Sequence, residues 1–550
     1  MDPQTAQKKS IFKNPVTYIV IVVIGIALIG GYLLLQTFVK ETETQGSEYK
    51  EGLAKEKVTV GVVGDLSARY PAVPFDFDSF GRNANVFEGL MIVRNGKMVP
   101  GLAESWTNPD KLTWRVKIRS GVEFHSGDKF TTEDVEYTIT EVTKHYPDWM
   151  GSYGAVRIAS TKIISDEIIE LKTATPDATL MSWLVYMPII SKEQVKKDGL
   201  DKAVGTGPYE IVSITPVEVV FTANESYWGG EPKVQTLVFN SFKDDKALAE
   251  GLDSGKANIA YFVDATNVKS LDKAKSRVLS ARVGDLTYIG FDTNKKAKYV
   301  STKENPFNNV KVRRAILLTL DVDKITQVSD REGQTLTQFA SADLIGFNPN
   351  LKRPEVDLAQ AKSLLAEAGF QDGFTVTLDY FDDTKNDVSS YSKVASEIKS
   401  QLAEIGVKVE LNPIDDFNQF LDKTGKGKKG DSSFYEGGYT PDTFDSTDLL
   451  NGFVHTFDRN TGLGFAVSTG FSDKEIDALL DQASSTLDPT ERVTIIQKVH
   501  EKVMEMLPLI PLSSRVRFYG VSNSVAFKPA PFGYIFGFEL SGREKSADSQ

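Results

Sequence analysis

A long apolar segment near the N-terminus sets the first constraint on the fold. Residues 16–39 read VTYIVIVVIGIALIGGYLLLQTFV and contain no charged side chain. About 20 apolar residues in a helix span the ~30 Å hydrocarbon core of a bilayer. Lys8, Lys9 and Lys13 precede the segment, and this positive-inside bias places the N-terminus in the cytoplasm. A cleaved signal peptide is the alternative, but its apolar region is usually shorter and ends at an Ala-x-Ala-like site. The segment predicts a retained single-pass anchor in the cell membrane, with the remainder outside.

The rest of the chain has the composition of a water-soluble globular protein. The whole chain is 41% hydrophobic and 25% charged, which is ordinary for a globular protein. Its length of 550 residues indicates two or three packed domains. A net charge of −12 argues against nucleic acid as a partner, because phosphate binding needs clustered Lys and Arg. The absence of cysteine excludes disulfides, thiolate metal sites and a lipid-modified N-terminal cysteine. Residues 40–57 are polar and predict a flexible tether, and residues 541–550 predict a disordered tail.

Hydrophobic periodicity predicts a mixed α/β fold. Residues 113–119 alternate as a half-buried strand, and Thr131 begins a capping-box sequence that opens a helix. Further along, Asp357 caps a predicted helix that Gly369 ends, followed by a strand, a second helix that ends at Gly406, and another strand. This helix–strand–helix–strand order predicts a parallel or mixed sheet with covering helices. A last long helix is predicted from Asp488, with Pro489 at its first position.

Motifs for catalysis and for metal or cofactor binding fail on inspection. Residues 251–256 have the wrong spacing for a phosphate loop, and residues 205–207 lack the third glycine of a dinucleotide fingerprint. His500-Glu501 begins like a zinc-protease helix, but Met504 stands where the second histidine belongs. We therefore predict no metal, no cofactor and no enzymatic activity. A glycosidase-like carboxylate pair is not excluded by the sequence, so a secreted hydrolase stays open as an alternative.

Ordered sequence segments carry a family resemblance over nearly everything after the tether. They include NVFEGLMIVRNGKMVPGLAESW from Asn85, GTGPYEI at 205–211, NESYWGGEPKVQTLVF at 224–239, NPFNNVKVRRAI at 305–316 and ERVTIIQKVHEKVMEMLPLIPL at 491–512. Together they resemble the solute-binding protein family 5 of ABC importers, the oligopeptide and dipeptide binders. The resemblance is specific for the family and does not identify a ligand.

The resemblance implies a two-lobed periplasmic-binding-protein fold of type II, similar to cluster C, with an extra domain. It places the solute-binding domain at 58–540. Lobe one would combine residues 58–89, 198–283 and 508–540, the extra domain would span 90–197, and lobe two would span 284–507. The ligand would lie between the lobes, which close around it by hinge motion.

Similarity to peptide-binding relatives also suggests the ligand site. Many of them carry a Gly-Trp-x-x-Asp-Tyr segment whose aspartate pairs with the peptide α-ammonium. The matching stretch here is FYEGGYTPD at 434–442, in which Tyr435 stands at the tryptophan and Gly438 at the aspartate. The expected ammonium anchor is therefore missing, or its role has moved to a nearby carboxylate. The candidate ligand-binding residues are Tyr435, Tyr439, Glu436, Asp442, Asp445 and Tyr70.

These observations predict the extracytoplasmic substrate-binding subunit of an ABC importer, which captures peptides or a related small solute. We expect a monomer whose partners are the ligand, the permease subunits of the transporter, and the membrane through residues 16–39. A membrane-anchored peptide-sensing receptor of the same fold, without import, is the second hypothesis. The sequence does not separate the two.

Overall fold

The computed structural model describes residues 49–67, 77–142, 144, 154–262, 270–294, 298–329, 333–382, 390–425, 431–459, 461–466, 470–530 and 533–545. The chain divides into a small unit, Met1–Leu53 with Arg543–Gln550, and a large unit, Ala54–Gly542. The predicted anchor at 16–39, residues 40–48 of the tether and Tyr70 lie outside the described residues. Within the described ranges, none of the helices is both long and apolar enough to span a bilayer.

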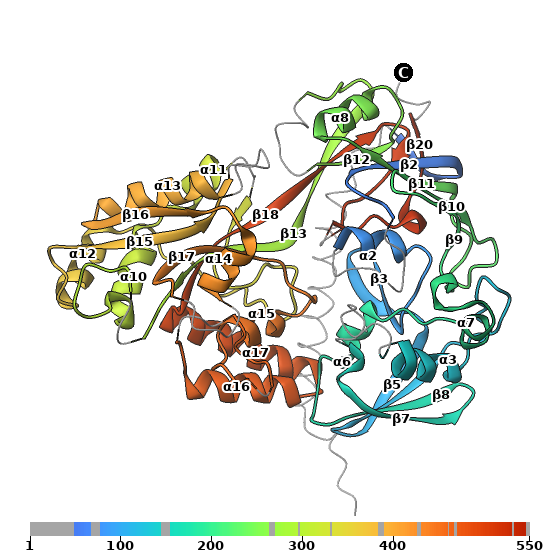
Figure 1. Cartoon of the computed structure of the whole chain (residues 1–550), viewed down its shortest axis with the longest axis horizontal. Helices are drawn as coiled ribbons and strands as arrows, with labels where there is room; N and C mark the ends of the chain where they lie inside the picture. The colour runs from blue at the N-terminus through green and yellow to red at the C-terminus, as the bar shows by residue number, and fades with distance from the viewer. Residues whose placement is uncertain are drawn as a thin grey trace, which may run out of the picture. The chain divides into compact units, whose positions relative to one another are not determined.

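Strands and helices are interspersed along the chain, with runs such as β3 to β6 and α15 to α17 (Figure 1). The strands are β1 (Tyr49–Leu53), β2 (Lys55–Val63), β3 (Met91–Arg94), β4 (Lys97–Pro100), β5 (Ala103–Asp110), β6 (Thr113–Ile118), β7 (Ile158–Ser165), β8 (Ile168–Thr173), β9 (Tyr209–Ile214), β10 (Glu218–Ala223), β11 (Val234–Phe242), β12 (Ile259–Phe262), β13 (Ser276–Phe291), β14 (Gly333–Thr335), β15 (Phe374–Phe381), β16 (Val407–Ile414), β17 (Phe434–Tyr439), β18 (Leu509–Ser522), β19 (Val525–Ala526) and β20 (Ser541–Lys545). The α-helices are α2 (Phe77–Asn83), α3 (Thr132–Tyr137), α6 (Leu180–Trp183), α7 (Lys192–Asp198), α8 (Asp245–Asp253), α10 (Val310–Thr319), α11 (Val322–Val328), α12 (Leu358–Glu367), α13 (Ser390–Ala403), α14 (Phe417–Thr424), α15 (Ser446–Phe453), α16 (Lys474–Ser485) and α17 (Pro489–Met506).

One large mixed sheet organises the big unit. Its strands follow the order β16-β15-β17-β13-β18-β12-β2-β11-β10-β9, with β14 paired to β18. At one end β2 runs parallel to β11 and β12, and at the other end β15 runs parallel to β16. The antiparallel strands β13 and β18 are the longest, with 16 and 14 residues, and they connect the two ends (Figure 1). This arrangement gives two α/β lobes that share a pair of strands.

The helix and strand predictions of the C-terminal half are confirmed. Asp357 caps α12 by accepting a hydrogen bond from the backbone N–H of Gln360, and β15, α13 and β16 follow in the predicted order. Gly369 and Gly406, which follow α12 and α13, have φ values of +86° and +84°. Side chains disfavour that left-handed backbone, which is why glycine ends both helices. Asp488 caps α17, with Pro489 at its first turn, also as predicted.

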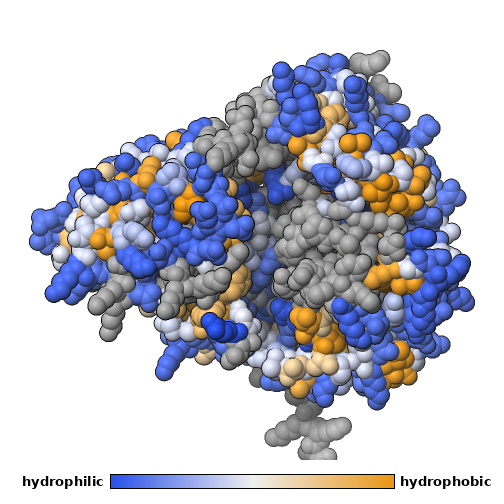
Figure 2. All heavy atoms as spheres, in the orientation of Figure 1, coloured by the Kyte–Doolittle hydropathy of each residue, from blue (hydrophilic) through white to orange (hydrophobic). Residues whose placement is uncertain are grey.

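A separate four-stranded antiparallel sheet, in the order β5-β6-β8-β7, lies within residues 90–197. β6 confirms the strand predicted at 113–119, and its buried residues alternate with exposed ones. The helix predicted after Thr131 forms as α3, and the Asp134 carboxylate accepts hydrogen bonds from the backbone N–H and hydroxyl of Thr131. On the face shown in Figure 2, hydrophilic side chains cover much of the coloured surface, as in a protein that lies in water.

Two boundary predictions are wrong. Residues 49–57, assigned to the flexible tether, form β1 and the start of β2, whose Lys55 N–H donates to the Lys233 carbonyl at 2.8 Å. The first five residues of the expected disordered tail form β20. Both stretches are rich in charged residues, which favours disorder in a composition-based reading. Strand pairing to a partner distant in sequence overrides that local preference.

Candidate functional site

Two carboxylates come together where β17 leads into α15. Asp442 lies in the connecting loop and Asp448 lies in the first turn of α15. The backbone N–H groups of Asp442 and Thr443 donate to Oδ2 of Asp448, at 2.7 and 3.2 Å. The hydroxyl of Tyr439 donates to Oδ2 of Asp442 at 2.9 Å. The loop therefore folds back on the helix and holds both acids, which we name the carboxylate pair.

The surroundings of the carboxylate pair disfavour two negative charges. Burial raises the pKa of Asp442 to about 6 and the pKa of Asp448 to about 8, and the charge of Asp442 adds to the rise at Asp448. Among the described residues, no lysine or arginine forms an ion pair with either acid. At neutral pH the pair thus retains a proton. A cation placed beside it would favour loss of that proton.

Aromatic side chains pack beside the carboxylate pair and form what we name the aromatic wall: Tyr288, Phe339, Tyr439 and Phe453. The rings of Tyr439 and Phe453 meet edge to face, with centroids 4.9 Å apart, and Tyr288 contacts Phe453 at 5.3 Å. Phe339 completes the wall at 5.2 Å from Phe453. Tyr288, Phe339 and Phe453 are buried in the core, so they support the loop from behind. Tyr439 is the member of the wall that is partly exposed, and its ring can contact a ligand.

Two further tyrosines lie close to the carboxylate pair. Tyr186, from the segment after α6, and Tyr534, from the C-terminal region, place their hydroxyl oxygens 3.5 Å apart. Burial raises the pKa of each tyrosine, and the charge of Asp442 contributes to the rise at both. Segments far apart in sequence therefore supply polar groups to one place.

Gly438 of β17 stands at the position of the aspartate in the peptide-binding relatives, and its surroundings leave little space for a side chain. Gly438 lies in β17 opposite Thr287 of β13. A Cβ atom at residue 438 would lie 2.7 Å from the hydroxyl oxygen of Tyr391 on α13. An aspartate at position 438 would therefore require the hydroxyl end of the Tyr391 side chain to move.

The structure places the predicted site residues in three groups. Tyr439 and Asp442 lie together in the site, as described above. Tyr435 is only 3% exposed, because its ring lies over Gly290 on the neighbouring strand, and Glu436 is also buried. Asp445 caps α15 and forms a buried ion pair with Arg492 of α17. Both Asp445 oxygens are thereby used inside the protein.

Sequence reasoning missed Asp448, Tyr186 and Tyr534. Asp448 looks like an ordinary acid in the first turn of a helix, where it complements the helix dipole. The one local signal was the spacing of acids at 442, 445 and 448, which places several carboxylates around one helix start. Tyr186 and Tyr534 carry no local signal, since only tertiary packing brings them to the carboxylate pair.

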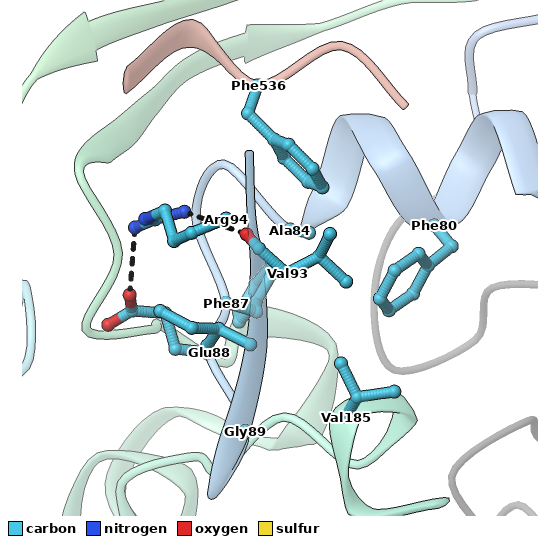
Figure 3. Close-up of a pocket in the computed structure, with 10 residues that line it drawn as sticks. Phe80, Ala84, Phe87, Glu88, Gly89, Val93, Arg94, Val185 and Phe536 are labelled. Carbon is cyan, nitrogen blue, oxygen red and sulfur yellow. Dashed lines mark hydrogen bonds and ion pairs between the residues drawn. The ribbon is translucent and has the colours of Figure 1, made fainter. Parts of the chain in front are cut away.

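The cavity beside Glu88 is not a solute site (Figure 3). Its volume is about 10 Å³, enough for roughly one water molecule. Glu88 accepts hydrogen bonds from Tyr227, Trp228 and Thr206 at 2.5, 2.7 and 3.0 Å, and Arg94 lies 3.6 Å away. Three of the segments that carry the resemblance, beginning at residues 85, 205 and 224, thus meet at one buried carboxylate. Their role here is structural.

Ser446 and His500 lie at the distance of a catalytic serine–histidine pair, but they are not exposed to solvent as a catalytic pair must be. Nε2 of His500 lies 3.0 Å from the hydroxyl of Ser446, and both residues are fully buried. A substrate could not reach this hydroxyl without unfolding α15 from α17. Within the described residues, no group of histidine and acidic side chains has the arrangement of a metal site.

Two α/β lobes joined by a pair of long strands, with carboxylates and a tyrosine gathered where β17 leads into α15, are the architecture of a protein that binds a solute and closes around it. The sequence model "Bacterial extracellular solute-binding proteins, family 5 Middle" matches residues 97–461, and the chain belongs to this family. It is a substrate-binding subunit of an ABC importer, as predicted.

Known relatives are similar over most of their length. Heme-binding protein A of Haemophilus influenzae is 26% identical, over 86% of this chain and 90% of that protein. The glutathione-binding protein GsiB of Escherichia coli is 25% identical, over 84% of this chain and 89% of its own. The solved structure of HbpA2 from Haemophilus parasuis superimposes with a TM-score of 0.77 at 22% identity, over 88% of this chain and all of that chain.

Proposed function

We propose that this chain captures a peptide or a similar small solute that carries a positively charged amino group. The carboxylate pair is the observation that carries the proposal. Two half-buried acids without a cationic partner in the described part of the chain leave a place for a cation. A desolvated ammonium needs such a paired carboxylate. The carboxylate pair would take the role of the aspartate that peptide-binding relatives carry at the position of Gly438.

One of the relatives supports this ligand chemistry, because it is named for glutathione, a tripeptide with a free ammonium group. Another is named for heme, which has no amino group, so the family binds solutes of more than one charge type. Tyr439, the partly exposed member of the aromatic wall, adds apolar surface beside the carboxylate pair, which suits a solute with an uncharged portion next to its ammonium. Tyr435, Glu436, Asp445 and Tyr70 stay in the proposal as neighbours of the ligand.

The proposal includes the arrangement of the chain in the membrane and in space. Residues 16–39 anchor the protein in the cell membrane, and the lobes lie outside and deliver the solute to the permease as a monomer. Lobe one comprises 58–89, 198–283 and 508–540, with an extra domain at 90–197, and lobe two comprises 284–507. The course of the large sheet, and the separate β5-β6-β8-β7 sheet, support these boundaries.

Binding of matched peptides tests the ligand chemistry. We expect calorimetry with the full chain to detect tri-alanine, and N-acetylated tri-alanine to bind at least about tenfold more weakly, a difference of about 1.4 kcal/mol. Asp448→Asn and Asp442→Asn should each weaken tri-alanine binding, whereas Glu410→Gln, which changes an exposed acid on β16, should not. Equal affinity for both peptides would remove the carboxylate pair from ammonium binding.

The pH dependence of binding provides a second, independent test. An ammonium ligand favours the ionised carboxylate pair, whose pKa values are raised to about 6 and about 8. Tri-alanine affinity should therefore increase as pH rises from 6 to 8, with release of protons on binding. Asp448→Asn should flatten this rise. A flat profile in the unaltered protein would contradict the proposal.

A further inference from the structure

The paired strands β13 and β18 are irregular at one place. Their register shifts between Arg282 and Leu286 and again between Leu286 and Tyr288. A bulge of this kind interrupts the ladder of hydrogen bonds and increases local twist. Because these two strands connect the two ends of the large sheet, the irregular stretch is where the lobes can rotate with the fewest broken bonds. Asp285 lies in that stretch.

Asp285 is buried and contacts three other side chains. Its Oδ2 lies 3.1 Å from a guanidinium nitrogen of Arg515 and 3.9 Å from one of Arg517, both on β18. Its Oδ1 accepts a hydrogen bond from the hydroxyl of Thr440 at 2.5 Å. The side chain of Asp285 is 5% exposed, and those of the two arginines are 22% and 25% exposed. We name these four residues the junction cluster.

Thr440 links the junction cluster to the candidate site. It follows Tyr439, the last residue of β17, and precedes Asp442 by two positions. The loop that carries the carboxylate pair is therefore tied by one hydrogen bond to the irregular stretch of β13. On the other side, the guanidinium of Arg517 lies over the ring of Tyr261 on β12, 5.0 Å from its centroid. The pKa of Tyr534 is affected by the charges of both Arg517 and Asp442.

The charges of the junction cluster make it sensitive to its geometry. Two guanidinium groups contact one buried carboxylate, so any rotation that lengthens a contact to Asp285 leaves the buried negative charge of Asp285 less well compensated. Conversely, the position of Asp285 fixes where Thr440 lies, and with it the backbone that leads to Asp442. Displacement at the strands and displacement at the loop are thereby coupled through one side chain.

We propose that Asp285 is a positioning residue that couples rotation of the lobes at β13 and β18 to the loop that carries Asp442. The effect on ligand affinity rests on the proposed function. The effect of the junction cluster on the lobes does not, because it is expected with or without a bound ligand. The hydrogen bond between Asp285 and Thr440 links the strands to the loop. When the strands adopt the geometry of the closed lobes, this bond keeps the carboxylate pair in the position that binds ligand. If a variant reduces the population of the state that binds ligand, its affinity for the ligand falls by the same factor.

Labelled full-length protein tests the coupling directly. The chain contains no cysteine, so Val212→Cys and Val356→Cys add two labelling sites at positions that are 60% and 47% exposed. Spin-label distances between them report the separation of the lobes. Without ligand, we expect Asp285→Asn and Thr440→Val to change the distance distribution, and Thr440→Ser, which keeps the hydroxyl, to match the unaltered protein. Asp372→Asn, an exposed acid in a turn, is the control.

Affinity for tri-alanine gives the second readout. We expect Asp285→Asn and Thr440→Val each to weaken it about five- to tenfold, and the double variant to lose no more than either alone, as for two residues that act through one bond. Unchanged distance distributions in both single variants would overturn the inference, as would additive losses. If the unaltered protein fails to bind tri-alanine, the proposed ligand class is wrong, and the unliganded distances still decide the coupling. Thr440→Val removes one partly buried hydrogen bond, so it decides the matter if Asp285→Asn does not fold.

Discussion

Three aspartates within seven residues, Asp442, Asp445 and Asp448, show how surroundings decide what a carboxylate does. Asp445 caps α15 and pairs with Arg492, so its charge is compensated within the protein. Asp442 and Asp448 have no such cation in the described part of the chain, and burial raises the pKa of both. A sequence reading that weighs these acids equally cannot separate them, because the separating residue, Arg492, is 47 positions away from Asp445. The sequence prediction therefore named Asp442 as a candidate and omitted Asp448.

His500 provides a prediction about acid stability. Burial lowers the pKa of His500 to about 3, against the opposing effect of the Asp445 charge, which Arg492 partly compensates. The unfolded chain takes up this proton near pH 6.5, whereas the folded protein takes it up only near pH 3. Between these values the unfolded state binds more protons, so stability falls as pH falls from about 6.5.

His500→Gln should remove part of that loss, on the order of 1–3 kcal/mol by pH 4. Glutamine cannot take up the proton in either state, and it can still bond to the Ser446 hydroxyl. Thermal unfolding at pH 7.5 and at pH 4.5 checks this expectation. The drop in midpoint should be smaller in the variant than in the unaltered protein. An identical drop would mean that other groups set the acid sensitivity.

Elements with strong local signals were predictable, and elements made by distant pairing were not. α12, β15, α13 and β16 follow from helical and alternating periodicity together with their glycine stops. β13 and β18 escaped prediction, since their sequences mix polar and apolar residues and they become long strands only through pairing with each other and with β12 and β17. The candidate site depends on those long strands, which is why the sequence analysis placed it by family resemblance rather than by periodicity.

The loop at residues 205–207 yields a prediction at the level of an element. A Cβ atom on Gly205 would collide with the backbone carbonyl of Val86, an atom that a side-chain rotation cannot move. Gly205→Ala should therefore destabilise the protein by about 1–3 kcal/mol, as overpacked positions do. Gly425→Ala is the control, because a Cβ there would meet its nearest atoms only at 3.8 and 3.9 Å. Chemical unfolding should separate the two variants, and equal stability would show that the 205–207 loop moves away freely.

At the scale of the molecule, the same long strands serve folding and binding. β13 and β18 contribute to the core of both lobes and carry the junction cluster, so the part of the sheet that holds the lobes together is also the part that can bend. The family resemblance supplied the two-lobed plan, whereas composition misplaced the edges of the folded region. Those edges matter for any soluble form of the protein, because β2 begins at Lys55 and not at Val58.

Truncation provides the prediction that belongs to this scale. Deleting residues 1–48 leaves β2 whole, whereas deleting residues 1–57 removes Lys55 and Lys57, which pair with Val234 and Thr236 of β11. Each backbone hydrogen bond lost from a sheet costs about 1 kcal/mol. We expect both forms to dissolve without detergent, because both lack the apolar segment, and the shorter form to unfold at a temperature several degrees lower. Parallel thermal melts of the two forms in the same buffer make the comparison. Equal melting temperatures would show that the large sheet does not depend on the first three residues of β2.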